Sequence, residues 1–111
     1  MFQIVSYKLP NSIKPYWQWL DSLKDTVARA RIRARIDRLI LGNFGDCKLI
    51  KNGVFELKFH FGPGYRVYYG MNEKTIVVLL LGGIKKTQAK DIERSLEYWK
   101  DFLRRKDEAL G

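Results

Sequence analysis

The chain has 111 residues, of which 46% are hydrophobic and 14% aromatic, so it is suited to one packed domain and too apolar for a disordered chain. Lys and Arg outnumber Asp and Glu by 21 to 12, giving a net charge of +9. This excess favours nucleic acid or another acidic partner, although charge that serves solubility alone is the other interpretation.

Cysteine use and hydropathy favour a cytoplasmic protein. The single cysteine, Cys47, cannot form an internal disulfide, which fits a reducing compartment. The first residues lack the pattern of a signal peptide. The longest apolar run, Ile76–Ile84, is about half the length that a membrane-spanning helix needs. We therefore expect a buried strand there and no membrane partner.

The first half of the chain predicts a strand and two helices. The strand covers Phe2–Tyr7, and Asn11 and Ser12 are candidate N-caps for the first helix. That helix places Pro15 in its first turn and has one apolar stripe: Ile13, Trp17, Leu20 and Leu23.

The second helix lies within the stretch "DTVARARIRARIDRLILGN". Its apolar face is predicted to consist of Ala28, Ile32, Ile36, Leu39 and Ile40, and Gly42-Asn43 ends it. Its arginines are expected on the remaining surface: Arg29, Arg31, Arg33, Arg35 and Arg38.

The second half changes to a period of two, which predicts four strands and a final helix. The strands are "CKLIK", "VFELKFHF", "YRVYYG" and "TIVVLLLGG", joined by turns at Asn52-Gly53, Gly62-Pro63-Gly64 and Met71–Lys74. The last strand is apolar on both faces and should lie centrally, covered on both sides. The helix covers Thr87–Arg105 with the stripe Ile92, Leu96, Trp99 and Leu103. The order β-α-α-β-β-β-α predicts a single α+β domain over residues 1–111, with a mostly antiparallel, twisted sheet.

Alternation along the hairpin strands predicts a polar face. Phe55, Leu57, Phe59, Phe61, Tyr65, Val67 and Tyr69 belong to the core face. We therefore expect five residues to share one surface outside the core: Glu56, Lys58, His60, Arg66 and Tyr68.

These residue types suit phosphodiester chemistry. Arg66 can bind two phosphate oxygens, His60 can donate or accept a proton, and Tyr68 offers a ring on which an unpaired base can stack. Lys85 and Lys86 follow the last strand and can reach the same cleft. The alternative is an ordinary solvated strand face. One His and one Cys offer no clustered metal ligands.

The stretches "GVFELKFHFGPGYRVYYG" and "IVVLLLGGIKKTQAKDIERSLEYWKDF" resemble the RelE/ParE (HigB-like) toxin superfamily of addiction-module killer proteins. The resemblance covers nearly the whole chain. It implies a toxin of a type II toxin–antitoxin system, held inactive in a hetero-oligomer with a cognate antitoxin. RelE-like and HigB-like members are mRNA interferases, usually acting in the ribosomal A site, whereas ParE-like members inhibit DNA gyrase.

Carried over by position, the resemblance implies that Arg66 acts on the scissile phosphate. Lys58 and His60 match basic positions of the preceding strand, and Lys86, with Lys85 beside it, matches a basic residue after the last strand. The implied reaction is attack of an RNA 2′-hydroxyl on its own 3′-phosphate, without metal or other cofactor. Lys58 or His60 would assist deprotonation, and Arg66 and Lys86 would stabilise the phosphorane.

Two other functions stay open at this point. A ParE-like gyrase inhibitor works by binding and needs no acid–base group. A basic RNA-binding or antitoxin-binding module on the same fold would be harmless without its partner. The sequence does not decide the target, the codon preference, the identity of the antitoxin or the oligomeric state.

Overall fold

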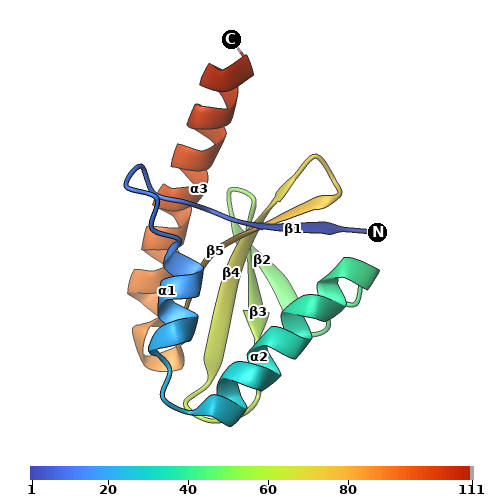
Figure 1. Cartoon of the computed structure of the whole chain (residues 1–111), viewed down its shortest axis with the longest axis vertical. Helices are drawn as coiled ribbons and strands as arrows, with labels where there is room; N and C mark the ends of the chain where they lie inside the picture. Colours follow the sequence, from blue (N-terminus) through green and yellow to red (C-terminus); the bar gives the residue numbers. More distant parts are fainter. Residues whose placement is uncertain (111) are drawn as a thin grey trace.

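One five-stranded sheet organises the chain, and helices cover both of its faces (Figure 1). The computed structural model describes residues 1–110, with side chains described as far as Glu108. Its elements in chain order are β1 (Gln3–Ser6), α1 (Pro15–Ser22), α2 (Thr26–Arg38), the 3-10 turn η1 (Leu39–Leu41), β2 (Cys47–Lys51), β3 (Val54–Lys58), β4 (Tyr65–Asn72), β5 (Ile76–Ile84), the 3-10 turn η2 (Lys85–Thr87) and α3 (Gln88–Leu110). The predicted α+β class and the four strands that follow the second helix are confirmed, whereas the order β-α-α-β-β-β-α is one strand short, because β2, β3, β4 and β5 all separate α2 from α3.

The strands lie in the order β1-β5-β4-β3-β2. β1 runs parallel to β5, and every other neighbouring pair is antiparallel. β5 lies inside the sheet, with α1 on one face and α3 on the other, so its predicted burial on both sides is confirmed. The middle strand of the five is β4.

The first helix begins later than predicted. Its N-cap is Lys14, whose backbone is extended because the following Pro15 disfavours the helical region. The predicted caps instead form a turn in which the Asn11 side chain accepts from the Ile13 N–H at 3.0 Å. Ile13 therefore precedes the helix, and Pro15, Tyr16 and Leu20 are its buried residues.

The second helix follows the prediction closely. The Asp25 side chain caps it by accepting from the Ala28 N–H at 3.0 Å, and Gly42 ends the η1 turn in a left-handed conformation (φ 84°). Four of the five predicted apolar positions are buried: Ala28, Ile32, Ile36 and Leu39. Ile40 is 37% exposed, because the 3-10 turn moves it off the helical stripe.

The β2–β3 hairpin turns at Asn52-Gly53 as predicted, with positive φ at both residues. β3 ends at Lys58 rather than Phe61, since the chain then enters the Gly62–Gly64 turn. One ladder bond continues past this end, from the Phe59 N–H to the Tyr65 carbonyl at 3.0 Å.

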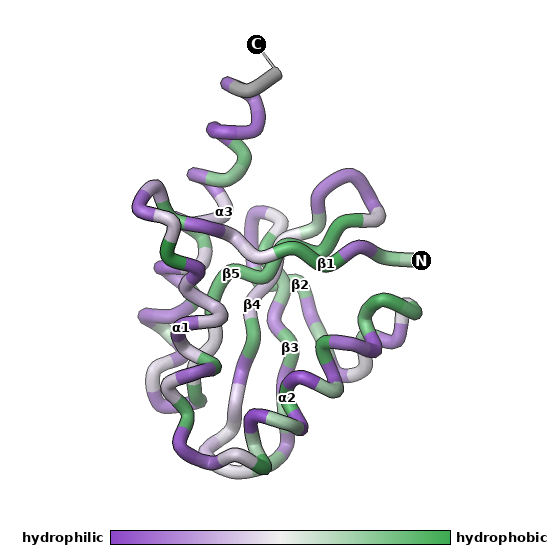
Figure 2. The backbone as a smooth tube through the Cα atoms, in the orientation of Figure 1, coloured by the Kyte–Doolittle hydropathy of each residue, from purple (hydrophilic) through white to green (hydrophobic). Residues whose placement is uncertain are grey.

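α3 covers the other face and extends beyond the sheet at its C-terminal end (Figure 1). Ile92, Leu96 and Trp99 pack on the sheet as predicted, whereas Leu103 is 37% exposed and Phe102 stacks on Trp99 in its place. Hydrophobic residues concentrate along the strands, and the distal part of α3 is largely hydrophilic (Figure 2). Among residues 1–110, no helix is both long and apolar enough to span a bilayer.

Candidate functional site

The polar residues of the β3–β4 hairpin pair across the two strands. Lys58 lies opposite Arg66, and Glu56 lies opposite Tyr68. On the far side of β4, Arg66 lies opposite Gly83 of β5. Residues directly opposite each other point to the same face, so the shared face predicted for Glu56, Lys58, Arg66 and Tyr68 is confirmed.

This face is not a surface outside the core, and that part of the prediction is wrong. Tyr68 is 0%, Glu56 1% and Arg66 6% exposed. α3 lies on this face, and Tyr68 belongs to the same buried cluster as Trp99. Alternation identifies which residues share a face, but it carries no information on what covers that face.

The first turn of α3 binds the buried carboxylate directly. The Gln88 Nε2 donates to Glu56 Oε2 at 2.7 Å. Asp91, one turn further on, lies over Gly83, where an added β-carbon would come within 1.9 Å of the Asp91 carboxylate. Thr87 donates to Asp91 at 2.5 Å and accepts from the Ile84 N–H at 3.3 Å. The start of α3 is thus fixed to the end of β5.

Arg66 is directed toward backbone groups at the start of its own strand. Its Nη1 donates to the Gly64 carbonyl at 2.8 Å and to the Tyr65 carbonyl at 3.2 Å. Its Nε lies 3.9 Å from Glu56 Oε1, which is longer than a hydrogen bond. Arg66 therefore has a charge partner nearby but only part of its donor capacity used within the described chain.

Three polar atoms of this face have no hydrogen-bond partner among the residues described: Glu56 Oε1, Arg66 Nε and the Tyr68 hydroxyl. Burial raises the pKa of Tyr68, and the nearby carboxylates of Glu56 and Asp91 add to the rise. Tyr68 is accordingly neutral at physiological pH. The Tyr68 ring is fully buried, so stacking on a base would require the ring to become exposed. Its predicted RNA-binding role stays a prediction.

Basic side chains border Arg66 at the solvent edge of this face. Lys85 adjoins the Gly64 turn, since a β-carbon at Gly64 would lie 3.1 Å from Lys85 Cβ and 3.2 Å from Arg66 Nη1. Lys85 and Lys86 are both exposed, and Lys58 is half-buried. Arg66 is thus brought together with Lys58 and Lys85.

His60 lies apart from the group formed by Lys58, Arg66 and Lys85, because β3 ends two residues before it. Its side chain is 69% exposed, and its Nε2 lies 2.5 Å from the Asp46 carboxylate. This contact, above all, holds the pKa of Asp46 below its usual range. The prediction that His60 shares a strand face with Arg66 is therefore wrong. Its role in proton transfer stays a prediction.

Sequence patterns did not predict that four further residues belong to this region: Arg35, Asp46, Gln88 and Asp91. Asp46 precedes β2 and is brought beside Lys58, whose N–H donates to the Asp46 carbonyl at 2.9 Å. Arg35 was expected on the helix surface, yet it donates to the carbonyls of Phe44, Asp46 and Lys58. The Asn52-Gly53 hairpin was a signal that could have placed Asp46 near the end of β3, to within one residue of its actual register.

Metal ligands do not cluster in the part of the chain described. No group of three or more His, Cys, Asp or Glu side chains is arranged there to hold a metal ion.

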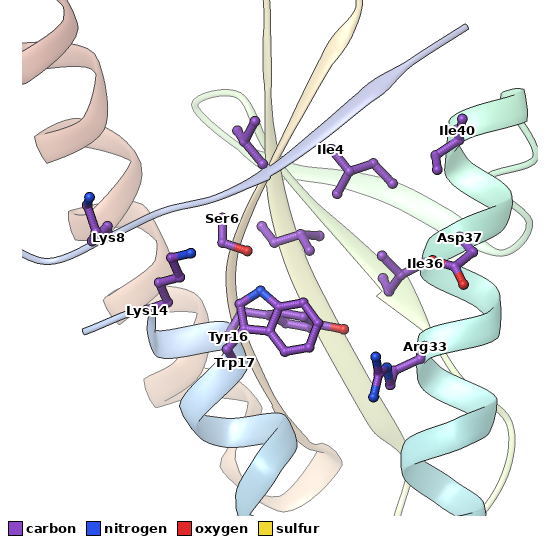
Figure 3. Close-up of a pocket in the computed structure, with 12 residues that line it drawn as sticks. Ile4, Ser6, Lys8, Lys14, Tyr16, Trp17, Arg33, Ile36, Asp37 and Ile40 are labelled. Carbon is purple, nitrogen blue, oxygen red and sulfur yellow. The ribbon is translucent and has the colours of Figure 1, made fainter. Parts of the chain in front are cut away.

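A groove of about 540 Å³ opens on the opposite face of the sheet, between β1, α1 and α2 (Figure 3). Aliphatic and aromatic side chains form its floor and walls, among them Ile4, Tyr16, Trp17, Ile36 and Leu79. Its charged residues are three cations and one carboxylate: Lys8, Lys14, Arg33 and Asp37.

The sheet, with two helices on one face and a long helix on the other, is consistent with a RelE-like fold. The family model described as Phage derived protein Gp49-like (DUF891) matches residues 18–97, and the chain belongs to this family. The match extends from α1 into α3 and includes every predicted site residue. The family is phage-derived, and its members are often toxin-like addiction-module proteins.

A relative in Haemophilus influenzae (strain Rd), described only as an uncharacterized protein, is 51% identical over 77 residues. The alignment covers 69% of this chain and 78% of the relative. Membership of the wider RelE/ParE superfamily stays a prediction.

Proposed function

We propose that the chain is the toxin of a type II toxin–antitoxin system and a ribosome-dependent mRNA endonuclease that inhibits translation. The toxin-like character of the Gp49-like family supports the first part. The observation that carries the second part is the grouping of Lys58 and Lys85 around Arg66 at one end of the hairpin. Three cations at one edge suit a phosphodiester, whose charge increases as the phosphorane forms.

The reaction is transfer of the phosphoryl group to the neighbouring 2′-oxygen. The 2′-hydroxyl gives its proton to Lys58 or His60, its oxygen bonds to phosphorus, and the bond to the leaving 5′-oxygen breaks. The 5′-oxygen takes up a proton, and the upstream fragment ends in a cyclic phosphate. Arg66 and Lys86 stabilise the added charge on the phosphoryl oxygens.

Arg66 has to rearrange to contact a phosphate. In the structure it is 6% exposed and donates to the Gly64 and Tyr65 carbonyls. The exposed Lys85 and Lys86 are available for the first contact with RNA. A net charge of +9 favours docking on ribosomal RNA, and the ribosome would position the messenger.

The test is induced expression of the chain alone, with primer extension on a reporter messenger. Growth arrest with cuts inside translated codons is expected for the wild type and should be lost in Arg66→Ala. Because Arg66 is buried, Lys86→Ala is the second variant, chosen because this exposed residue can be changed without disturbing the core. Arg104→Ala, a basic residue on the distal part of α3, is the matched control and should remain toxic.

The other outcomes identify the alternatives. Arrest without RNA cuts would favour the ParE-like gyrase inhibitor, and the absence of arrest would favour the non-catalytic binding module. A fully toxic Arg66→Ala that still cleaves RNA would show that the proposed phosphate role of Arg66 is wrong.

We further propose that the cognate antitoxin inserts an acidic segment with apolar side chains into the groove between α1 and α2 (Figure 3). Lys8, Lys14 and Arg33 outnumber the single carboxylate of Asp37, so the charge favours acidic residues. The aliphatic floor favours Leu, Ile or Val side chains over the phosphates of RNA. A partner there lies on the sheet face opposite Arg66.

Charge reversal tests this placement. A variant with Lys14→Glu and Arg33→Glu should weaken capture of the antitoxin by about 100-fold or more, in line with the cost of opposed like charges. Lys48→Glu with Lys51→Glu on the far edge strand β2 gives the same change in net charge and should bind normally. Equal binding by both variants would exclude the groove.

A further inference from the structure

His60 is the single histidine of the chain and one of two candidates for the base in the proposed reaction. It lies in the turn between β3 and β4, two residues after the half-buried Lys58. Its Nε2 is 2.5 Å from Asp46 Oδ2, and the two side chains are 69% and 54% exposed. A pair as exposed as this one usually stabilises a fold very little.

The backbone of Asp46 and the end of β3 just before His60 are nevertheless held by one side chain. Arg35 reaches from α2 and donates to the carbonyls of Asp46, at 2.8 Å, and of Lys58. Its guanidinium also lies over the Phe59 ring, 4.5 Å from the ring centre. The Lys58 N–H closes the arrangement by donating to the Asp46 carbonyl at 2.9 Å. The backbone of Asp46 is thereby tied to that of Lys58, two residues before His60.

The chemistry of the contact determines which ring nitrogen is free. An ionised carboxylate only accepts hydrogen bonds, so Nε2 must carry the proton that it donates to Asp46. The low pKa of Asp46 keeps that carboxylate ionised. Nδ1 is then the ring nitrogen left to accept a proton from a substrate.

We propose that Asp46, fixed by Arg35, is a positioning residue that holds His60 with Nδ1 toward the RNA, and that His60 rather than Lys58 is the base. The inference rests on the proposed ribonuclease function. The 2′-hydroxyl proton moves to Nδ1 as the 2′-oxygen bonds to phosphorus and the bond to the 5′-oxygen breaks. The 5′-oxygen takes a proton from water, and the imidazolium later returns its proton to solvent. Asp46 stabilises the imidazolium without receiving a proton.

The first readout needs no activity. Because His60 is the single histidine, its ring signals in NMR spectra are unambiguous. An exchange-protected Nε2–H signal is expected in the wild type and should be lost in Asp46→Asn. In His60→Gln, the pKa of Asp46 should rise toward its ordinary value. Asp21→Asn on α1 is the matched control and should leave the His60 signals unchanged.

The second readout is single-turnover cleavage of messenger RNA on programmed ribosomes. His60→Gln should lower the rate constant about 100-fold or more and Asp46→Asn about 10-fold, with little change in KM. The double variant should be no slower than His60→Gln alone, because Asp46 acts through His60. A residue that merely stabilised the fold would slow cleavage again in the His60→Gln background.

The two proposals fail in different ways. Wild-type protein that cleaves RNA, with Asp46→Asn equally fast or with additive effects in the double variant, would overturn the positioning role and leave the ribonuclease standing. Wild-type protein that cleaves nothing would overturn the proposed function and this inference with it. Absence of a protected Nε2–H signal would overturn the geometry, whatever the activity.

Discussion

The two faces of the sheet bury different kinds of side chain. Against α1 and α2 the buried residues are hydrophobic: Tyr16, Leu20, Ala28, Ile32, Ile36, Leu39, Leu57, Phe59, Tyr65, Val67, Tyr69, Val77 and Leu79. The other face also has a hydrophobic cluster, but it buries Glu56 and Arg66 beside it. Buried polar atoms on this face lack hydrogen-bond partners, whereas no such atom is found on the α1/α2 face of the described chain.

The difference indicates what each face contributes. An unpartnered buried polar atom costs about 1–3 kcal/mol, so a face selected for stability alone would carry apolar residues of similar shape. Buried polar groups without partners are a feature of functional sites. We therefore expect the α1/α2 face to determine the stability of the fold and the α3 face to carry the function.

The largest effect is expected from the apolar face. Ile32→Ala removes a fully buried side chain of α2 and should lower the free energy of unfolding by about 2–5 kcal/mol. Val27→Ala in the same helix removes a side chain that is 67% exposed and should change it by less than about 0.5 kcal/mol. Urea unfolding measures both. Equal losses would contradict the assignment of stability to this face.

The next effect concerns the buried carboxylate of the other face. Glu56→Ala leaves the Gln88 amide without its acceptor and should cost about 1–3 kcal/mol. Glu56→Gln keeps an oxygen that can accept from Gln88, so it should cost less. If Glu56→Gln were as damaging as Glu56→Ala, the negative charge beside Arg66 would itself hold the fold together.

Much of the fold could be predicted because its signals are local. The two-residue Asn52-Gly53 turn and the stop at Gly42 depend on conformations that few residue types adopt. The start of α1 was misplaced because several turn-forming residues stand together before it, and the restriction that Pro15 imposes on Lys14 decided between them.

The site was predictable only in part, because burial and register depend on the whole chain. Alternation placed Arg66 and Tyr68 on one face but could not reveal that α3 covers them. Simple pairing from the Asn52-Gly53 turn would put Cys47 opposite Lys58. An irregularity between Leu49 and Lys51 instead pairs Cys47 with Leu57, which brings Asp46 beside Lys58.

A smaller effect on stability is expected at Tyr7, whose hydroxyl makes a hydrogen bond on the α3 face. The Tyr7 hydroxyl donates to Asp101 of α3 at 2.6 Å, so Tyr7→Phe should cost about 1 kcal/mol at pH 7. Burial, and then the Asp101 hydrogen bond, raises the pKa of Tyr7 to about 12. The same contact is the main cause that lowers the pKa of Asp101.

The two pKa shifts define the pH window of this contact. A lowered folded-state pKa means that the contribution of Asp101 is present above its unfolded value of about 3.9 and is lost as the pH falls further. The raised pKa of Tyr7 means that its contribution is present below about pH 10 and is lost as the pH rises through about 12. Urea unfolding at pH 7 and pH 3 should therefore show a cost of Tyr7→Phe that shrinks in acid. A constant cost would mean that Tyr7 acts through packing alone.

The smallest effect on stability is expected at Tyr68, a tyrosine of the same face whose hydroxyl has no partner among the described residues. Tyr68→Phe should leave the free energy of unfolding unchanged or raise it by up to about 1 kcal/mol, because it removes an unpaired polar atom. Measured beside Tyr7→Phe, it compares an unpartnered hydroxyl with a partnered one in a single urea series. A loss of stability as large as that of Tyr7→Phe would show that the Tyr68 hydroxyl donates to Glu56 and that it is not an unpartnered polar group of the α3 face. No loss in stability, together with reduced toxicity, would mean that this hydroxyl is kept for the function of the site.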